Sequence, residues 1–313
     1  MEAIRTDNLT KRFDNLTAVD RLTLSVAPGE LFALVGSDGA GKTTTLRMLA
    51  GIMDPTEGEA RVLGRAVPAD AEAIRGDIGY MSQRFGLYPD LTVQENIHFY
   101  ADIFGLTRRE REERLEQLLA FSNLTPFKNR RAGNLSGGMK QKLGLACALI
   151  HTPRILLLDE PTNGVDPVSR RDFWRILYQL LREGVTIIVA TAYLDEAERC
   201  NRVGLIHQGR LMACAPPQEL KQLMRGTILE VATPQARRAG HLLRERLSGV
   251  TVGLFGDRLH VVTGSPDTTA EAINAILAHE RMAEPAIRTI EPSLEDVFVS
   301  VLGTSHVTAQ PDA

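Results

Sequence analysis

The chain has 313 residues, 43% of them hydrophobic, and a formal net charge of −3 from 36 basic and 39 acidic residues. This length allows two domains, each with its own hydrophobic core, and the balanced charge argues against a nucleic-acid partner. The three cysteines, Cys147, Cys200 and Cys214, form no C-x-x-C pair, so the sequence indicates neither a disulfide framework nor a structural zinc site. No run of about 18 apolar residues could span a bilayer, so any role at a membrane is expected to be that of a peripheral subunit.

Short apolar runs alternate with turns over the first 83 residues or so, which predicts the start of an α/β core. Residues 22–26 and 31–35 are expected to form strands. The second run leads directly into the glycine-rich stretch GSDGAGKTTT, residues 36–45, which is followed by an amphipathic segment that closes near Gly51. A strand, a glycine-rich loop and a helix are therefore predicted to follow one another.

The glycine-rich stretch matches the phosphate-loop pattern G-x-x-x-x-G-K-[ST]. Glycines allow backbone N–H groups to converge on phosphate oxygens, and the following helix start adds its positive end. Lys42 is then expected to neutralise β and γ oxygens, and Thr43 to bind Mg²⁺. A glycine-rich turn that binds nothing is the alternative. The predicted nucleotide contacts are Gly36, Ser37, Asp38, Gly39, Ala40, Gly41, Lys42, Thr43 and Thr44.

From about residue 84 to residue 150 the pattern becomes helical, and we expect a helical insertion in the core. Thr92 and Thr107 each precede a glutamate by three positions, which is the spacing of a capping box at a helix start. Residues 155–159 and 185–190 then resume the core as buried strands with a helix between them. Strands that alternate with helices predict an α/β fold with a doubly wound sheet.

The segment LSGGMKQK, residues 135–142, offers a second place where an anion could bind. Ser136, Gly137 and Gly138 stand at the start of a predicted helix, so their backbone N–H groups and the Ser136 hydroxyl are available to a phosphate. A plain helix cap is the alternative. With this segment, one chain carries two predicted phosphate-binding arrangements.

Two adjacent carboxylates, Asp159 and Glu160, follow the predicted strand ILLLD. Asp159 is expected to be a Mg²⁺ ligand together with Thr43, and Glu160 to polarise an attacking water. Adjacent carboxylates at a strand end also occur as ordinary solvated turns. The phosphate loop earlier in the chain favours the catalytic interpretation.

After Pro216 and Pro217 the pattern changes to that of a separate small domain, expected over residues 226–303. Its predicted order is strand, helix, strand, strand, helix, strand, from TILEVAT at residue 227 to PAIRTIEP at residue 285. This order indicates a small α+β domain of the split βαβ, roughly ferredoxin-like type. The polar tail, residues 304–313, is expected to be disordered.

With a phosphate loop, LSGG and LLLDEP in this order, residues 1 to about 225 resemble the nucleotide-binding domain of ABC transporter ATP-binding subunits. The resemblance implies a P-loop ABC ATPase core that uses ATP and Mg²⁺. It also implies that two such domains, in a homodimer or a heterodimer, pair head to tail. Each ATP would then lie between the phosphate loop of one domain and the LSGG segment of the other.

Three further residues match positions that this family uses at its nucleotide site. Phe13 matches the aromatic residue that stacks on adenine, although an aromatic in an N-terminal strand is also compatible with a core position. Gln83 matches the glutamine that contacts Mg²⁺ or the attacking water and communicates with the membrane subunit, or it is simply a polar loop residue. Asp166 matches the aspartate that reaches across the dimer, and it also precedes Pro167 as a helix N-cap.

The chain departs from the family at one position after the strand at residues 185–190. The family has a histidine in the pattern T-H-x-L-D-E-A-E, whereas this chain has Ala192 there. Alanine neither accepts a proton nor contacts a γ-phosphate. We therefore expect that the chain's own site binds Mg-ATP but hydrolyses it slowly, and that its LSGG segment serves a second, histidine-bearing nucleotide-binding domain.

The ending EPSLEDVFVSVLG, residues 291–303, together with SRRDFWRIL, resembles the drug-exporter branch of the family. Within that branch the chain is similar to the first nucleotide-binding half of multidrug exporter ATPases that carry two such halves in one polypeptide. The resemblance implies ATP-driven dimer closure coupled to efflux, with drugs or hydrophobic compounds as the cargo. It also implies separate transmembrane permease subunits and a peripheral position on the cytoplasmic face of the cell membrane.

The apolar FGLY, residues 85–88, is the candidate contact with those permeases, and internal packing of the same residues is an equal alternative. Two other functions remain open from the sequence. One is a soluble ABC protein of DNA repair or translation, which the balanced charge and the exporter-like ending disfavour. The other is a regulatory module that binds ATP with little turnover.

Overall fold

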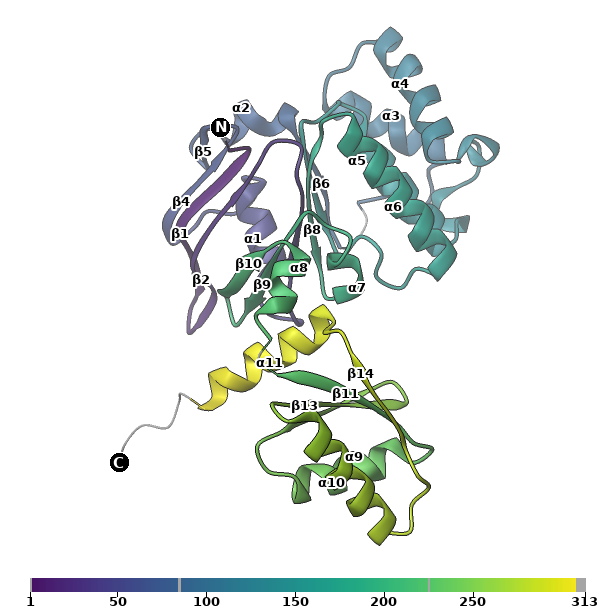
Figure 1. Ribbon diagram of the computed structural model, residues 1–313. Helices are drawn as coiled ribbons and strands as arrows, with labels where there is room; N and C mark the ends of the chain where they lie inside the picture. The colour runs from purple at the N-terminus through teal and green to yellow at the C-terminus, as the bar shows by residue number, and fades with distance from the viewer. Residues whose placement is uncertain (1, 84–85, 225, 308–313) are drawn as a thin grey trace. The chain divides into compact units, whose positions relative to one another are not determined.

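The computed structural model describes residues 2–83, 86–224 and 226–307. The chain divides into two compact units, Met1–Pro217 and Gln218–Ala313, where we expected a boundary near residue 225. Figure 1 labels most of their helices and strands. Among the described residues, no helix is long and apolar enough to cross a membrane.

The core of the first unit is a six-stranded sheet in the order β10-β9-β3-β8-β7-β6. Its strands are parallel except for the β9–β10 hairpin. Every residue of β3, β7 and β8 is buried, as expected for parallel strands covered on both faces. The bounds are β3 Leu31–Val35, β6 Ile78–Met81, β7 Ile155–Asp159, β8 Thr186–Thr191, β9 Arg202–His207 and β10 Arg210–Ala215.

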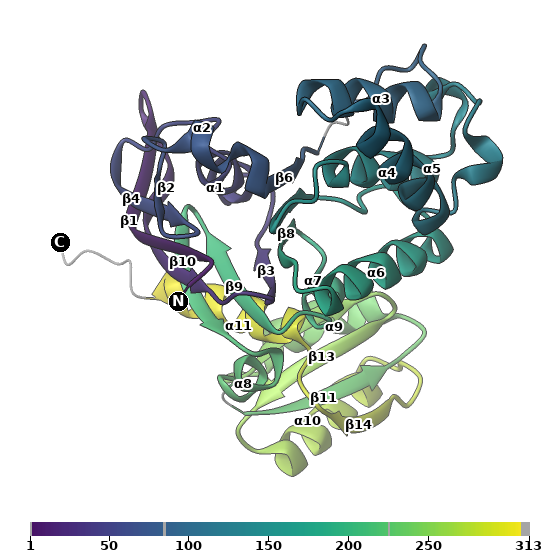
Figure 2. The same cartoon turned by 90° about the horizontal axis from the view of Figure 1, so that it is seen from above.

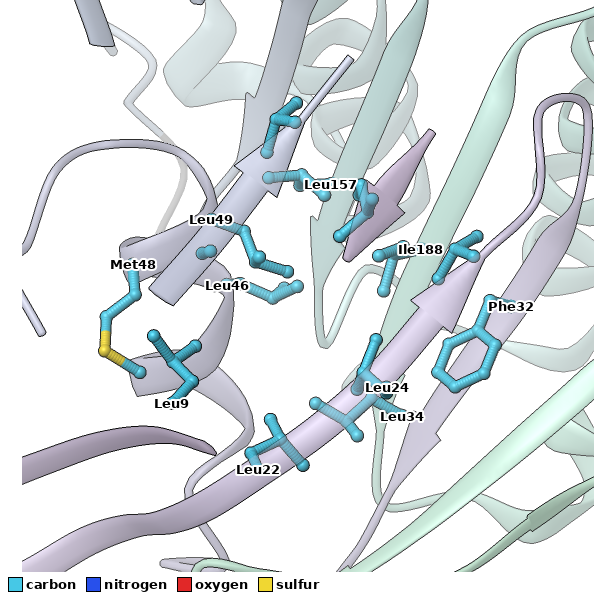
Figure 3. Packing of buried hydrophobic residues seen from close by; sticks show 14 of the residues in the cluster. Leu9, Leu22, Leu24, Phe32, Leu34, Leu46, Met48, Leu49, Leu157 and Ile188 are labelled. Atoms are coloured by element: carbon cyan, nitrogen blue, oxygen red, sulfur yellow. The ribbon is translucent and has the colours of Figure 1, made fainter. Parts of the chain in front are cut away.

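A second, antiparallel sheet in the order β2-β1-β4-β5 lies beside helix α1, Lys42–Leu49. Helix α1 packs between the two sheets, and both contribute to one apolar cluster (Figures 2 and 3). Leu46 and Leu49 of α1 are buried there with Leu157 of β7, and full burial of each such leucine contributes about 1.5–3 kcal/mol. The bounds are β1 Ile4–Phe13, β2 Leu16–Val26, β4 Glu57–Val62 and β5 Arg65–Val67.

The remaining helices of this unit include those of the predicted insertion. Thr92 and Thr107 both form complete capping boxes, as predicted from their spacing. Helices α3, α4 and α5 gather beyond β6, and α6 packs on α5 (Figure 2). The bounds are α2 Ala71–Ile74, η1 Arg75–Asp77, α3 Val93–Ile103, α4 Arg108–Phe121, η2 Thr125–Phe127, η3 Ala132–Asn134, α5 Gly137–Leu149, α6 Pro167–Arg182 and α7 Leu194–Ala197. Helix α8, Pro217–Gln222, begins at the last residue of this unit and continues into the second.

The second unit has the predicted order of elements and an antiparallel sheet in the order β12-β13-β11-β14. Helices α9 and α10 cover one face of this sheet with a small apolar core. This is the split βαβ arrangement. The bounds are β11 Thr227–Ala232, α9 Ala236–Arg246, β12 Thr251–Phe255, β13 Arg258–Thr263, α10 Pro266–His279, β14 Ala286–Ile290 and α11 Leu294–Val307.

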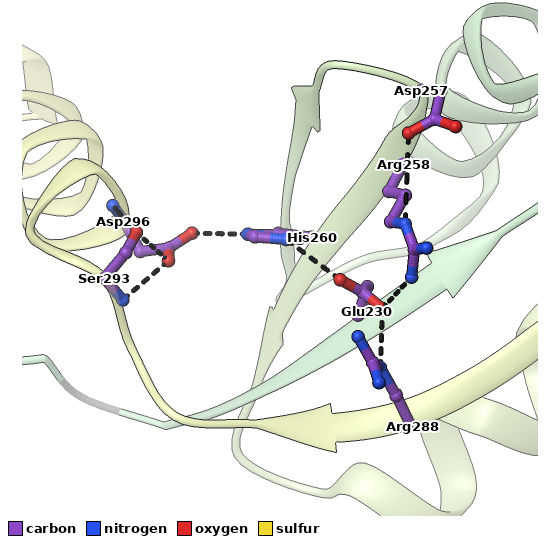
Figure 4. A network of polar contacts seen from close by, with 7 residues as sticks. All are labelled: Glu230, Asp257, Arg258, His260, Arg288, Ser293 and Asp296. Atoms are coloured by element: carbon purple, nitrogen blue, oxygen red, sulfur yellow. Dashed lines mark hydrogen bonds and ion pairs between the residues drawn. The ribbon is translucent and has the colours of Figure 1, made fainter. Parts of the chain in front are cut away.

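The other face of the small sheet carries a charged network (Figure 4). Glu230 accepts from Arg258 and Arg288 at 2.6 Å each, and these bonds hold the pKa of the Glu230 carboxyl below its usual range, Arg288 having the largest effect. His260 Nδ1 lies 2.7 Å from Asp296 of α11. The network therefore attaches α11 to the sheet by polar contacts.

The prediction of a disordered tail over residues 304–313 is wrong for residues 304–307, which are helical. Helix α11 continues to Val307, past the predicted start of the tail at Thr304. A helix that has already formed gains one backbone hydrogen bond with each added residue, which favours its extension. Residues 308–313 lie outside the described residues.

Candidate active site

The predicted site residues of the core converge on one edge of the six-stranded sheet. Val35 pairs with Thr191, and Asp159 pairs with Ala190, so the carboxyl ends of β3, β7 and β8 lie side by side. The loops that follow these parallel strands emerge at the same edge. Ligands of open α/β sheets bind at this edge.

The phosphate loop leads from β3 into α1 with a left-handed residue at its end. Gly41 is the N-cap of α1 with φ 104°, a conformation that is readily available only to glycine. A Cβ at Gly41 would also lie 2.3 Å from the Ala18 carbonyl oxygen. The sequence therefore needs glycine here for two separate reasons.

Lys42 lies inside the loop and reaches the second carboxylate of the strand end. Its Nζ donates to the carbonyl oxygens of Gly36 at 2.7 Å and Ser37 at 3.1 Å. It also forms an ion pair with Glu160 Oε1 at 3.1 Å, with both side chains about 6% exposed. The Lys42 amine, the loop backbone and the Glu160 carboxylate thus form one buried cluster.

Thr43 and Asp159, the two predicted metal ligands from the core, are in direct contact. Thr43 Oγ1 donates to Asp159 Oδ1 at 3.0 Å. The other oxygen, Asp159 Oδ2, is buried with no hydrogen-bond partner among the described residues. Burial raises the pKa of the Asp159 carboxyl, the Thr43 bond opposes the rise, and the Glu160 charge adds to it. A hydroxyl beside a carboxylate with a free oxygen fits a hard cation such as Mg²⁺.

Glu160 adopts an unusual backbone conformation. Its φ is 50°, in the left-handed region that is uncommon for residues other than glycine. The backbone holds it there, because Glu160 N–H donates to the Ala190 carbonyl at 2.8 Å. Such local strain is concentrated at functional sites. The carboxylate also accepts from the backbone N–H of Ala192 at 3.4 Å, so position 192 lies beside it.

Tyr80 is a neighbour of this cluster that the sequence did not single out. It lies on β6 in register with Leu157, two residues before Asp159 on the neighbouring strand. Burial raises the pKa of the Tyr80 phenol, and the Asp159 charge raises it further. No local motif marks Tyr80. Only the pairing of β6 with β7 brings it to the site.

The LSGG segment forms the start of α5, as predicted. Ser136 is the N-cap, and its Oγ accepts from Met139 N–H at 3.3 Å. Ser136 and Gly137 are exposed, whereas Gly138 is buried against α6, where a Cβ would lie 2.4 Å from Ser169 Cβ. Helix capping and close helix packing therefore both occur in this segment.

The other predicted residues lie outside the buried cluster. Asp166 caps α6 by accepting from Val168 and Ser169 N–H groups at 3.1 and 2.9 Å, and the Ser169 backbone bond lowers the pKa of its carboxyl most strongly. Phe13 is 41% exposed at the end of β1, so it is not a core residue. Gln83 is exposed just after β6.

Among the residues that the structure describes, no hydrogen bond or ion pair links Phe13, Gln83, Ser136 or Asp166 to Lys42 or Asp159. Part of FGLY is described: Tyr88 is 45% exposed and its ring lies 4.5 Å from that of Phe99. Phe85 lies outside the described residues.

A buried loop lysine, a hydroxyl–carboxylate pair and a second carboxylate at the edge of a mostly parallel sheet define a P-loop nucleotide-binding domain. Residues 19–163 match the profile of the ABC transporter family. The chain is 37% identical to the Nod factor export ATP-binding protein I of Burkholderia pseudomallei (strain 1710b), over 94% of each chain. The chain therefore belongs to the ABC transporter ATP-binding proteins, a family of ATPases.

Another relative is the probable multidrug ABC transporter ATP-binding protein YbhF of Escherichia coli (strain K12), at 41% identity over 98% of this chain and 53% of that protein. The chain thus spans about half the length of YbhF. A solved ATP-binding subunit of an ABC transporter superposes with a TM-score of 0.64 and 29% identity, covering 71% of this chain and 92% of that one. A dimeric ATP-binding cassette with ADP and Pi superposes with a TM-score of 0.63 and 28% identity, covering 68% and 98%.

Proposed function

We propose that this chain binds Mg-ATP at its phosphate loop and uses ATP binding and hydrolysis to drive export through separate permease subunits. The buried cluster of Lys42, Thr43, Asp159 and Glu160 carries the proposal. Lys42 would neutralise the β and γ phosphates, and the loop backbone from Gly36 to Thr44 would bind the remaining oxygens.

Thr43 and Asp159 are the proposed Mg²⁺ ligands, with Gln83 as a further ligand or a contact to the attacking water. The free, buried Asp159 Oδ2 supports this assignment. Bound Mg²⁺ would supply neutralisation of phosphate charge. Glu160 would orient and polarise the water, because its carboxylate is held at the same edge of the sheet by the Ala192 N–H and by Lys42.

A second nucleotide-binding domain is the proposed partner of the site residues that lie outside the buried cluster. Ser136, Gly137 and Gly138 would bind the γ-phosphate held by the partner, and Asp166 would reach across the same seam. Phe13 would stack on adenine, for which its exposure of 41% is suitable. ATP would thus join the two domains, and its hydrolysis would separate them.

Ala192 suggests that the two sites of such a pair differ. Its backbone lies against Glu160, but a methyl group provides no proton acceptor. A positioned proton-handling side chain is worth about 10² to 10⁴ in rate. We therefore propose slow turnover at this chain's own site and a partner domain that retains a histidine at this position.

The surface beside α3 and α5 is the proposed contact with the permeases. A cavity of about 210 Å³ lies between these helices and the end of α1, lined among others by Ile52, Tyr80, Tyr100 and Phe104. Ile52 at its rim is 62% exposed. An apolar groove with an exposed isoleucine suits an amphipathic segment of a membrane protein. The chain would then sit on the cytoplasmic face of the membrane.

The proposed cargo is a drug or another hydrophobic compound. The names of two relatives support export as the activity, one a probable multidrug transporter protein and the other a Nod factor export protein. Co-purification with a membrane permease tests this part. Recovery with ribosomes or DNA instead would favour a role in translation or DNA repair.

The central experiment compares nucleotide binding and phosphate release of the full chain with those of Glu160→Gln and Lys42→Ala. We expect wild-type protein to bind Mg-ATP tightly and to release phosphate slowly. Glu160→Gln should retain binding and lose turnover, whereas Lys42→Ala should lose binding. ATP binding with turnover insensitive to Glu160→Gln would instead indicate a regulatory module, and no binding at all would refute the proposal.

A further inference from the structure

Glu196 on α7 is a fully buried carboxylate that accepts hydrogen bonds from the loop after β7 and from the last residue of β8. It has 0% exposed surface. Its Oε2 accepts from the hydroxyl of Thr191 at 2.9 Å, and its Oε1 accepts from the hydroxyl of Thr162. Both threonines are about 1% exposed, so neither hydroxyl has water as an alternative partner. One side chain therefore links two segments that are separated along the chain.

The two segments are those that flank Glu160. Thr162 follows Glu160 by two residues, and Thr191 immediately precedes Ala192. The same segments are also joined by the bonds of Glu160 itself, from its N–H to Ala190 and from Ala192 N–H to its carboxylate. The Glu196 bonds thus close a ring of contacts around the catalytic candidate.

The same carboxylate reaches toward α6. Arg170 of α6 lies 3.6 Å from Glu196 Oε1 and 3.6 Å from Asp195, and its guanidinium stacks on Tyr193 at 4.6 Å. The Tyr193 hydroxyl donates to Asn163 at 3.3 Å. Helix α6 begins at the Asp166 cap and packs on Gly138 through Ser169. The network therefore extends from Glu160 toward the predicted seam between domains.

Burial of this carboxylate carries an energetic cost that apolar packing would not. Removing a carboxylate from water costs about several kcal/mol per ion in proteins, and the attraction within a single ion pair often does not offset this cost. Glu196 accepts hydrogen bonds from the hydroxyls of Thr162 and Thr191 and is paired with the Arg170 guanidinium. An apolar side chain could make none of these contacts.

We propose that Glu196 is a positioning residue for ATP hydrolysis, which fixes the Thr162 and Thr191 segments so that Glu160 and residue 192 keep their relative placement. The inference rests on the proposed function, in which Glu160 orients the attacking water. Glu196 itself does not touch the nucleotide.

The test substitutes Glu196→Gln, which keeps size and removes one acceptor oxygen, and Thr162→Val, which removes one donor. Asp195→Asn is the matched control, because Asp195 also pairs with Arg170 but its side chain is 63% exposed. We expect kcat of both test variants to fall about 10- to 100-fold, the loss typical of a misplaced catalytic group. The KM for ATP should stay within about twofold, and Asp195→Asn should match wild type.

Melting temperatures and a double mutant separate positioning from general destabilisation. Combining Thr162→Val with Glu196→Gln should lower kcat little more than either change alone, because both break the same contact. Unchanged kcat in well-folded Glu196→Gln protein, or in Thr162→Val if the first variant does not fold, would overturn the inference. So would a fall in kcat that only follows the loss of folded protein.

Amide hydrogen exchange provides a readout that does not depend on ATP hydrolysis. Loss of the Glu196 bonds should accelerate exchange in residues 160–166 and 190–193 together, and Asp195→Asn should leave both segments unchanged. Equal exchange in Glu196→Gln and wild type would refute the link between the segments even if the chain hydrolyses ATP. Conversely, faster exchange in a chain that has no ATPase activity would refute the proposed function and leave the structural link standing.

Discussion

Ala192 lies against Glu160: its backbone N–H donates to Glu160 Oε2 at 3.4 Å. Ala192 is exposed, so a larger side chain at this position has room. Glu160 is 7% exposed and held in a left-handed backbone conformation. A rigid carboxylate thus stands next to a position whose side chain can be changed without disturbing the core.

Replacing Ala192 with histidine is predicted to raise the rate of ATP hydrolysis. An imidazole beside Glu160 could accept a proton or contact the γ-phosphate, and such groups contribute about 10² to 10⁴ in rate. Steady-state phosphate release by Ala192→His and wild type measures the gain. Asp195→His, at a nearby position in α7 that is also exposed, is the control. If both variants turn over at the wild-type rate, the missing histidine does not limit this site.

Asp159→Asn is predicted to stabilise the nucleotide-free protein and to abolish its stabilisation by Mg-ATP. Burial raises the folded-state pKa of Asp159 above its unfolded value, so the ionised form opposes folding at neutral pH, and this effect disappears as pH falls through the folded pKa. Asparagine removes that charge. Ligand at 100 times its Kd stabilises a protein by about 2.7 kcal/mol, and this gain should vanish with a lost Mg²⁺ ligand.

Thermal unfolding with and without Mg-ATP checks both effects in one experiment. Asp54→Asn is a control outside the site. A lower melting temperature of the nucleotide-free Asp159→Asn variant would show that Asp159 supports the fold instead of a ligand. Retained stabilisation by Mg-ATP would remove Asp159 from the metal site.

Neighbouring glycines of the LSGG segment are predicted to respond differently to alanine. A Cβ at Gly138 would lie 2.4 Å from Ser169 Cβ, whereas at Gly137 the nearest atom is the Gly164 carbonyl oxygen at 3.8 Å. Gly138→Ala should therefore cost about 1–3 kcal/mol of stability through overpacking. Gly137→Ala should preserve the melting temperature and weaken ATP-dependent pairing of domains, measured by size-exclusion chromatography. Unaltered pairing in Gly137→Ala would argue that this segment is only a helix cap.

The sequence was most informative where apolar runs are continuous. Residues 31–35 and 155–159 were predicted as strands, and β3 and β7 have these bounds. The antiparallel sheet was not separated from the core, because β1 has an irregular burial pattern and shifts of register that hide its alternation. Continuous burial leaves a local signal, whereas a strand with irregular burial and shifted register does not.

The residues of the site also divide into those with a local sequence signal and those without one. Short motifs contain Lys42, Thr43, Asp159 and Glu160, and the sequence alone indicates the chemistry of these motifs. The structure brings the four residues together. Tyr80 approaches Asp159 only through the pairing of β6 with β7. Glu196 accepts from Thr191 on the preceding strand and from Thr162 in a segment that is distant in the sequence. Tyr80 stands in no motif that marks its role. Glu196 stands in the pattern that also contains Ala192, but the pattern does not show that Glu196 contacts Thr162, because that contact is tertiary.

His151 is predicted to make the first unit less stable at acidic pH. Its ring stacks on Phe104 at 3.6 Å, and Nε2 donates to the Ile78 carbonyl at 3.0 Å. Nδ1 is buried with no partner among the described residues, so a proton there would be an unpaired donor. Burial accordingly lowers the pKa of His151, the Ile78 bond opposes the shift, and the Arg114 charge adds to it.

Because the folded pKa lies below the unfolded value of about 6.5, the unfolded chain takes up more protons as pH falls through that value, and stability is lost. Melting temperatures at neutral and mildly acidic pH measure this loss. His151→Gln, which keeps a donor for the Ile78 carbonyl, should start lower because it loses the stacking, but should fall less on acidification. His241→Gln, at an exposed histidine of the second unit, should follow wild type. Parallel curves for wild type and His151→Gln would mean that His151 is readily protonated in the folded protein.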